Sequence, residues 1–114
     1  MYDSKGNLRV RAYTAGGALP VPNATVRIIG ADEENRNVAR SVITDRDGVA
    51  LFRDIPAPNI KYSLTPNPTE RPYATYDLEA ISDGYAAKYL KGVTVFSGIE
   101  SFQPLNLIPI TNER

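Results

Sequence analysis

Proline and glycine are spread along the whole sequence, and they limit its possible folds more than any other feature. Nine prolines and eight glycines interrupt the 114 residues so often that no run of apolar residues at helical spacing lasts three turns. Proline fixes φ and removes a backbone donor, whereas glycine allows the positive φ of tight turns. Short segments separated by these residues are typical of an antiparallel β protein. We therefore predict one all-β domain over residues 1–114, which is long enough to bury a core and could be part of a longer chain.

Apolar and polar residues alternate within these segments, as they do in strands with one buried face. In the first segment, Leu8, Val10 and Ala12 are expected to point inward. The sixth segment is expected to break or bulge at Gly92. The predicted strands are 7–13, 24–30, 38–44, 49–55, 74–82, 85–96 and 101–110. Seven strands at this spacing predict a β-sandwich.

Two short motifs predict structural turns. Asp45-Arg46-Asp47-Gly48 lies between a β-branched run and an alternating run, which predicts a hairpin turn. Its two aspartates resemble the start of a calcium loop, but the rest of the ligand run is missing, so we predict no metal there. Asp83-Gly84 predicts a second turn.

Two longer segments are predicted to be loops. Residues 31–37 are mostly polar and are expected to form a solvated hairpin loop. Residues 56–73 hold several prolines and are expected to form a long irregular crossing. Within it, residues 61–64 are expected to be a short extended piece.

Composition excludes several classes of function. The chain has no histidine, cysteine or tryptophan, so Ser-His-Asp and Cys-His catalysis are excluded, and zinc, haem and iron–sulfur centres lack their usual ligands. We therefore predict no cofactor. Thirteen basic and thirteen acidic side chains give zero net charge, which argues against a nucleic-acid partner. No apolar run is long enough for a membrane span, so no membrane insertion is expected. Residues 1–7 hold no hydrophobic core of a signal peptide, and the sequence leaves the cellular compartment undecided.

Several segments together resemble the carboxypeptidase regulatory-like domains. These are residues 19–26, residues 44–52 with the Asp-Arg-Asp-Gly turn, residues 76–80, and Asp83-Gly84-Tyr85. The resemblance covers nearly the whole chain. It implies a seven-stranded antiparallel Greek-key sandwich of the prealbumin-like (transthyretin-like) type. An immunoglobulin-like sandwich has the same number of alternating strands and stays open as an alternative.

A narrower resemblance points to a bacterial setting. Pro56-Ala57-Pro58, residues 72–76, residues 92–103 and residues 107–110 look like the N-terminal β-domain of clostridial spore cortex-lytic enzymes and related spore or cell-wall proteins. In that family the β-domain accompanies peptidoglycan-binding or hydrolase domains and is not the hydrolase. The resemblance therefore implies an accessory domain whose partners are neighbouring domains or a wall or cortex glycan.

Acidic residues do not form a convincing active site in the sequence. A glycosidase needs two carboxylates facing each other across a cleft, but the alternation places Asp77, Glu79 and Glu100 on wet faces. We therefore predict no enzyme activity. Related surface domains carry an isopeptide crosslink between a first-strand lysine and a last-strand asparagine. Asn106 and Glu79 resemble two of its members, but Lys5 lies too early in the chain, so we reject the crosslink.

Tyrosine supplies the most plausible binding chemistry. A tyrosine ring can stack on a sugar while its hydroxyl forms hydrogen bonds. Of the seven tyrosines, Tyr73 is expected to be the best exposed candidate and Tyr89 is a second. Tyr76 and Tyr85 are expected to be core or corner residues.

The favoured function is a non-catalytic accessory domain of a spore or cell-wall protein, acting as a spacer, docking or wall-targeting module. One alternative is a carbohydrate- or peptidoglycan-binding module that uses exposed tyrosines, although the lack of tryptophan weakens it. Another is a structural subunit of a surface or phage-like assembly held by strand-edge contacts. The sequence leaves the oligomeric state undecided.

Overall fold

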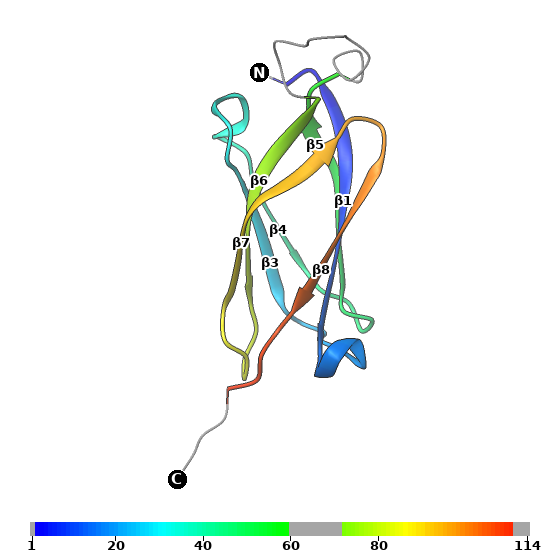
Figure 1. The fold of residues 1–114 in the computed structure, drawn as a ribbon, viewed down its shortest axis with the longest axis vertical. Helices are drawn as coiled ribbons and strands as arrows, with labels where there is room; N and C mark the ends of the chain where they lie inside the picture. Colours follow the sequence, from blue (N-terminus) through cyan, green and yellow to red (C-terminus); the bar gives the residue numbers. More distant parts are fainter. Residues whose placement is uncertain (1, 60–71, 111–114) are drawn as a thin grey trace.

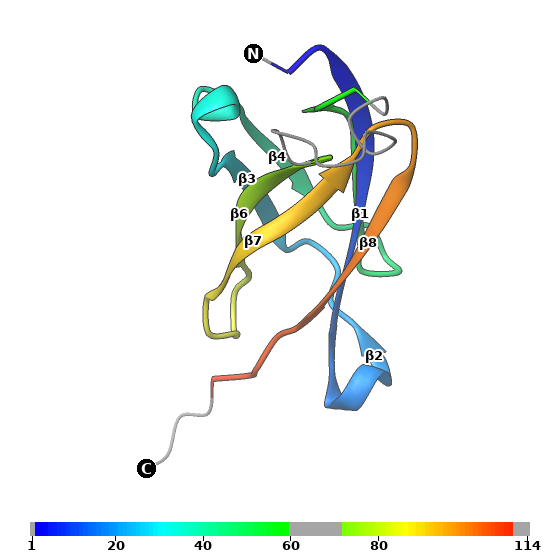
Figure 2. The same cartoon turned by 45° about the horizontal axis from the view of Figure 1, so that its top comes forward.

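Two facing β-sheets form the molecule in a computed structural model, which describes residues 2–59 and 72–110 (Figure 1). The first sheet contains β1 (Ser4–Thr14), β2 (Leu19–Pro20), β5 (Val49–Ala57) and β8 (Glu100–Asn106). The second contains β3 (Thr25–Gly30), β4 (Ala39–Ile43), β6 (Tyr73–Ile81) and β7 (Lys88–Phe96). The turned view places the strands of the second sheet on one side and β1 and β8 on the other (Figure 2). The all-β sandwich is confirmed, and β2 is a short strand that the sequence did not predict.

Helical structure is limited to two short 3₁₀ turns in the described part of the chain. These are η1 (Ala15–Gly17) and η2 (Glu33–Asn35). Within residues 2–59 and 72–110, no helix has the length and apolar character needed to cross a membrane.

The core lies between the sheets and follows the predicted alternation. Leu8, Val10 and Ala12 of β1 are fully buried. They face the buried residues of β3 and β6, among them Val26, Ile28 and Tyr76. Side chains at alternate positions of each strand therefore close the space between the two sheets, as a sandwich requires.

The first and last strands lie side by side and run in the same direction. β8 pairs with β1 in parallel, with Asn7 opposite Glu100 and Tyr13 opposite Asn106. The other strand pairs in the described part of the chain are antiparallel. The expectation of a purely antiparallel sandwich is therefore wrong at this pair, because alternation reveals which face is buried but not which strand is the neighbour. The sheet orders are β2-β1-β5 with β8 on β1, and β4-β3-β6-β7.

The Asp45–Gly48 turn reverses the chain but does not form the expected hairpin. Its geometry is as predicted: Asp45 Oδ1 accepts hydrogen bonds from the amides of Asp47 (2.9 Å) and Val49 (3.0 Å), and Gly48 has φ 78°. However, β4 pairs with β3 and β5 pairs with β1, so the turn carries the chain from the second sheet to the first. Turn residues determine the reversal, and tertiary packing determines the partner strand.

Two strands, β5 and β7, each contain a β-bulge that changes which of the following residues point inward. Phe52 and Ile55 are both buried although they are three residues apart in β5. This is possible because Arg53 and Asp54 together oppose Asn7, with Asp54 at φ 56°. The predicted break at Gly92 is confirmed as a second bulge, where Gly92 has φ 73°.

The loop between β3 and β4 is the hairpin loop that its composition suggested, and five of the seven residues 31–37 are exposed, but Asp32 and Asn35 anchor it to the sandwich. Asn35 is only 1% exposed, and its side chain donates to Thr75 O (3.0 Å) and accepts from Asp32 N (2.8 Å). Asp32 Oδ2 accepts from Tyr2 Oη (2.8 Å) and Thr75 N (2.7 Å), and Asp32 Oδ1 accepts from Thr75 Oγ1. We call Tyr2, Asp32, Asn35 and Thr75 the Asp32 network. It ties the loop to β6, and a contact partner 40 residues away could not be inferred from local composition.

The long crossing is described only at its two ends. β5 extends to Ala57, and β6 begins at Tyr73. The extended piece expected at 61–64 lies outside the described residues.

Candidate ligand-binding site

The side of the second sheet that faces away from the first carries Tyr89, which is 63% exposed. Tyr89 is the Cα partner of Glu79, and Glu79 is the partner of Arg27, so these three residues form one row across β7, β6 and β3. Ile81 and Ile43 are also exposed, and both flank Thr25 in the next row. A ring flanked by charged groups and exposed aliphatic residues is a surface on which a flat, hydroxyl-rich ligand can stack.

Tyr73 is less accessible than its sequence position suggested. It is half-buried, and its ring packs against Phe96 with a centroid distance of 5.5 Å and an interplanar angle of 51°. The expectation that it is the best exposed candidate is therefore wrong, because Phe96 lies directly opposite it on β7. Tyr89, the second candidate, presents more of its surface.

The tyrosines expected to be structural occupy structural positions. Tyr76 is fully buried, and its hydroxyl donates to Pro56 O (2.6 Å). This burial raises the pKa of Tyr76 to about 12. Tyr85 is half-buried and packs against the core at one corner of the sandwich.

The carboxylates considered for catalysis do not face each other across a cleft. Asp77 and Glu79 lie on the outer face of the second sheet, whereas Glu100 lies on the first sheet and pairs with Arg9 at 2.8 Å. Within the described residues, no group of three or more acidic residues is placed to hold a metal ion. Lys5 and Asn106 lie at opposite ends of β1, which agrees with rejecting the crosslink.

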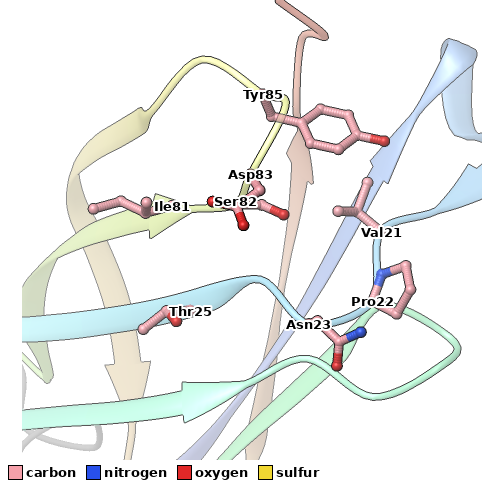
Figure 3. A pocket seen from close by; sticks show the side chains of 8 residues that line it. All are labelled: Val21, Pro22, Asn23, Thr25, Ile81, Ser82, Asp83 and Tyr85. Atoms are coloured by element: carbon pink, nitrogen blue, oxygen red, sulfur yellow. The ribbon is translucent and has the colours of Figure 1, made fainter.

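A pocket of about 490 Å³ lies at the end of the sandwich where β3 begins and β6 ends (Figure 3). One wall is the segment before β3, and the other is the turn after β6. We call it the Tyr85 pocket, and its lining residues are Val21, Pro22, Asn23, Thr25, Ile81, Ser82, Asp83 and Tyr85. Asp83 and Gly84 had been predicted as a turn, which is confirmed by Gly84 at φ 84° and by the bond from Tyr85 N to Ser82 O (3.2 Å).

The polar side chains of the Tyr85 pocket have hydrogen-bonding capacity that the described residues leave unused. The side chains of Asn23, Thr25, Ser82, Asp83 and Tyr85 form no hydrogen bond or ion pair with any described residue. In Figure 3 the Tyr85 ring lies beside Val21, whereas Ser82 and Asp83 lie near the middle of the view. A pocket lined by an aromatic ring and several polar side chains is typical of a small-molecule site.

Buried Thr44 holds the first wall in place. Thr44 is 2% exposed, and its hydroxyl accepts from Ala24 N (2.9 Å) and donates to Val21 O (2.8 Å). Its carbonyl accepts from Asn23 N (3.0 Å). This wall is therefore fixed before any ligand arrives, which lowers the entropy cost of binding.

Residues 108–110, which follow β8, hold the second wall in place. Ala86 N donates to Ile108 O (2.9 Å), and Ile110 N donates to Gly84 O (2.8 Å). Tyr85 and Pro109 also form an isolated antiparallel β-bridge through their backbones. The turn that presents Ser82 and Asp83 is therefore pinned on its far side.

Asn23 has an unusual backbone conformation. Its φ of 61° lies in the left-handed region, which asparagine tolerates better than most non-glycine residues. In this conformation the exposed amide side chain is presented at the pocket (Figure 3). Such outliers occur more often at ligand-binding positions than elsewhere.

The sequence did not indicate Asn23, Thr25 and Ser82 as site residues. Each is a common loop or strand-end residue, and 57 positions separate Thr25 from Ser82 in the chain. The available signal was the pair of turn-forming stretches around Asn23 and Asp83, but nothing local shows that β3 and β6 bring them together.

A smaller pocket of about 260 Å³ lies near the first residues of β1 and the start of β8. Two of its polar side chains are already engaged, because Asn7 Oδ1 accepts from Asp54 N (3.0 Å) and Glu100 pairs with Arg9. It therefore offers a ligand fewer free groups than the Tyr85 pocket.

Each exposed sheet edge carries a feature that hinders pairing with another strand. Asp54 bulges β5, and Gly92 bulges β7. On β4, Arg40 lies on the inward face, opposite Ile28, and donates to Arg53 O (3.4 Å). On β8, Pro104 lies at the free edge and has no N–H to donate. These are the means by which natural sheets avoid edge-to-edge association.

No family model matches the sequence, and no curated protein matches it. Solved structures share its fold. The TIE protein of Bacillus anthracis aligns with a TM-score of 0.63 at 17% identity, over 95% of this chain and 17% of that one. A proposed carbohydrate-binding protein from Bacteroides uniformis aligns with a TM-score of 0.63 at 11% identity, over 94% and 43%. The GBS52 minor pilin of Streptococcus agalactiae aligns with a TM-score of 0.59 at 14% identity, over 100% and 48%.

The chain thus spans less than half the length of each of these proteins. The likeness establishes a small β-sandwich domain that is similar to parts of larger bacterial proteins, without a family assignment. The same fold serves differently named proteins, so function must be argued from the site.

Proposed function

We propose that this domain is a non-catalytic binding module of a bacterial spore or cell-wall protein, and that it attaches that protein to a polysaccharide. The observation that carries the proposal is the exposed ring of Tyr89 in its row with Glu79 and Arg27. The ring offers a stacking surface, and the two charged neighbours can bond to sugar hydroxyls. The similar structure from Bacteroides uniformis, itself proposed to bind carbohydrate, supports this role.

Non-catalytic action fits the chemistry of the chain. It has no histidine or cysteine, and Asp77, Glu79 and Glu100 lie on open sheet faces rather than across a cleft. An open face without a cleft supports a non-catalytic role for these carboxylates.

The protected sheet edges favour glycan binding over assembly through strand edges. Pairing with a second chain needs an accessible row of donors and acceptors. Pro104 and the bulges at Asp54 and Gly92 interrupt such rows.

A spacer role is compatible with glycan binding. The start of β1 lies beside Gly98, whereas Ile110 bonds to Gly84 at the other end of the sandwich (Figure 1). The two ends of the described chain are thus far apart. A module with this geometry can sit in series with neighbours while its sheet face stays free.

Co-sedimentation with purified peptidoglycan sacculi tests the proposal. We expect the domain to pellet with sacculi and Tyr89→Ala to weaken binding about tenfold, which corresponds to about 1.4 kcal/mol. Phe102→Ala is the matched control, because Phe102 is an aromatic residue with 58% exposure on the opposite sheet. Failure of the unaltered domain to pellet, or an equal loss in both variants, would contradict the proposal. Release of soluble fragments from the sacculi would overturn the non-catalytic assignment.

A further inference from the structure

We infer that the Tyr85 pocket is a subsite for one hydroxyl-rich saccharide unit that is neutral or carries an amine. The inference rests on the polysaccharide-binding role proposed above and names the ligand class of a second contact region. It depends on side chains that differ from those of the Tyr89 row, so the two can be tested separately.

The size of the pocket suits a small ligand. Its volume of about 490 Å³ falls within the range of roughly 300–1,000 Å³ found for small-molecule sites. Val21, Pro22 and the Tyr85 ring provide apolar lining. A sugar ring presents C–H groups on its faces and hydroxyls around its rim, which matches this arrangement.

The polar groups of the pocket match hydroxyls better than any other ligand group. The hydroxyls of Thr25, Ser82 and Tyr85 and the amide of Asn23 can all both donate and accept hydrogen bonds. The Asp83 carboxylate can only accept. Hydroxyl groups also donate and accept, so a hydroxyl-rich ligand can pair with each of these kinds of side chain.

Charge narrows the ligand class further. Among the described residues that line the pocket, Asp83 alone carries a formal charge, and none is a lysine or an arginine. An anionic sugar would place its charge near this carboxylate without a compensating cation. A neutral unit avoids this repulsion, and an amine would be attracted by it.

The pocket is continuous with the proposed stacking surface. Thr25 and Ile81 line the pocket, and they are Cα partners on the outer face of the second sheet. Two residues further along β3 and β6 are Arg27 and Glu79, the neighbours of Tyr89. A linear oligosaccharide with one unit in the pocket can therefore extend along this face towards Tyr89.

Isothermal titration with three soluble trisaccharides tests the inference. The probes are triacetylchitotriose, which is neutral, the glucosamine trimer, which carries amines, and trigalacturonic acid, which is anionic. We expect the first two to bind and the third to bind at least tenfold more weakly. Equal or tighter binding of trigalacturonic acid would overturn the ligand class.

Three variants locate the site. Asn23→Gly removes the amide and suits the positive φ, Tyr85→Phe keeps the ring, and Asp83→Asn removes the charge. We expect Asn23→Gly and Tyr85→Phe to weaken triacetylchitotriose binding about fivefold. Asp83→Asn should weaken binding of the glucosamine trimer at least tenfold. Asp47→Asn makes the same charge change at an exposed turn outside the pocket and should have no effect.

The outcomes separate this inference from the proposed function. Unchanged affinities in all three pocket variants overturn the subsite. If Tyr89→Ala still weakens sedimentation in that case, the polysaccharide-binding role stands without the pocket. Absence of binding by triacetylchitotriose and the glucosamine trimer also overturns the subsite, whether or not the domain pellets with sacculi.

Discussion

Two clusters of polar side chains lie at opposite ends of the sandwich, and they use their hydrogen bonds in opposite ways. In the Asp32 network the side chains of Asp32, Asn35 and Thr75 all bond to other members. In the Tyr85 pocket the five polar side chains bond to no described residue. The side chains of the Asp32 network hold a loop against β6, whereas those of the Tyr85 pocket are available to a ligand.

This difference in hydrogen bonding distinguishes polar residues that stabilise the fold from polar residues that can bind a ligand, even where no family is assigned. Both clusters are formed by loops that join β3 and β6 to their neighbours, so composition alone does not distinguish them. Burial and hydrogen-bond partners do distinguish them, because a buried polar group must be satisfied within the protein. We therefore expect changes at the network to alter stability and changes at the pocket to alter binding.

Gly30→Ala should have the largest effect on stability. A Cβ at Gly30 would lie 1.8 Å from the carbonyl oxygen of Asn35, so the backbone around the Asp32 network must move. We expect a loss of about 3 kcal/mol in the free energy of unfolding, measured by urea denaturation. At the pocket end, a Cβ at Gly84 would meet no atom of the described residues within 4 Å. Only the φ of 84° is unfavourable there, so we expect Gly84→Ala to cost about 1 kcal/mol. Equal losses in the two variants would remove the contrast between the ends.

Alkaline pH should weaken the network end through Tyr76, which follows Thr75 in β6. Its folded pKa is raised to about 12, above the ordinary value of 10, so the folded state favours the protonated ring. The stability is fully present below pH 10 and falls as pH rises from 10 through 12, by about 2–3 kcal/mol. Unfolding curves at pH 9 and pH 12 should show a smaller loss in Tyr76→Phe than in the unaltered protein. Asp83→Asn should keep the original pH dependence.

Thr44→Val should link stability to binding. The change keeps the shape of the side chain but leaves Val21 O and Ala24 N without their partner. We expect a loss of about 2 kcal/mol by urea denaturation, together with weaker binding of triacetylchitotriose, because the first pocket wall is no longer held. A loss of stability with unchanged affinity would show that the wall does not depend on Thr44.

Asp83→Asn should have the smallest effect on stability. The carboxylate is exposed and has no partner among the described residues, so its replacement should change the free energy of unfolding by less than about 0.5 kcal/mol. A melting temperature close to that of the unaltered protein would agree with this. A marked shift would mean that Asp83 supports the fold rather than a ligand.

Local patterns predicted the strands but not their neighbours. Leu8, Val10 and Ala12 were placed correctly in the core because alternation depends only on nearby residues. The parallel pairing of β8 with β1 and the passage of the Asp45–Gly48 turn between sheets depend on contacts distant in sequence. No periodicity encodes such contacts, which is why the expected hairpin was wrong.

The candidate site was predictable only in part for the same reason. Tyr89 could be named as a candidate because a tyrosine offers a flat ring and a hydroxyl whatever its neighbours are. Tyr73 was misjudged because its cover, Phe96, comes from another strand. Asn23 and Asp83 are ordinary loop residues until β3 and β6 place them at one end of the sandwich.

Amide chemical-shift mapping tests the contrast between the two ends most directly. The unaltered domain, labelled with nitrogen-15, is titrated with triacetylchitotriose. We predict shifts at Asn23, Asp83 and Tyr85, with Asp32, Asn35 and Thr75 unchanged. Shifts centred on the Asp32 network, or none at the Tyr85 pocket, would contradict the account.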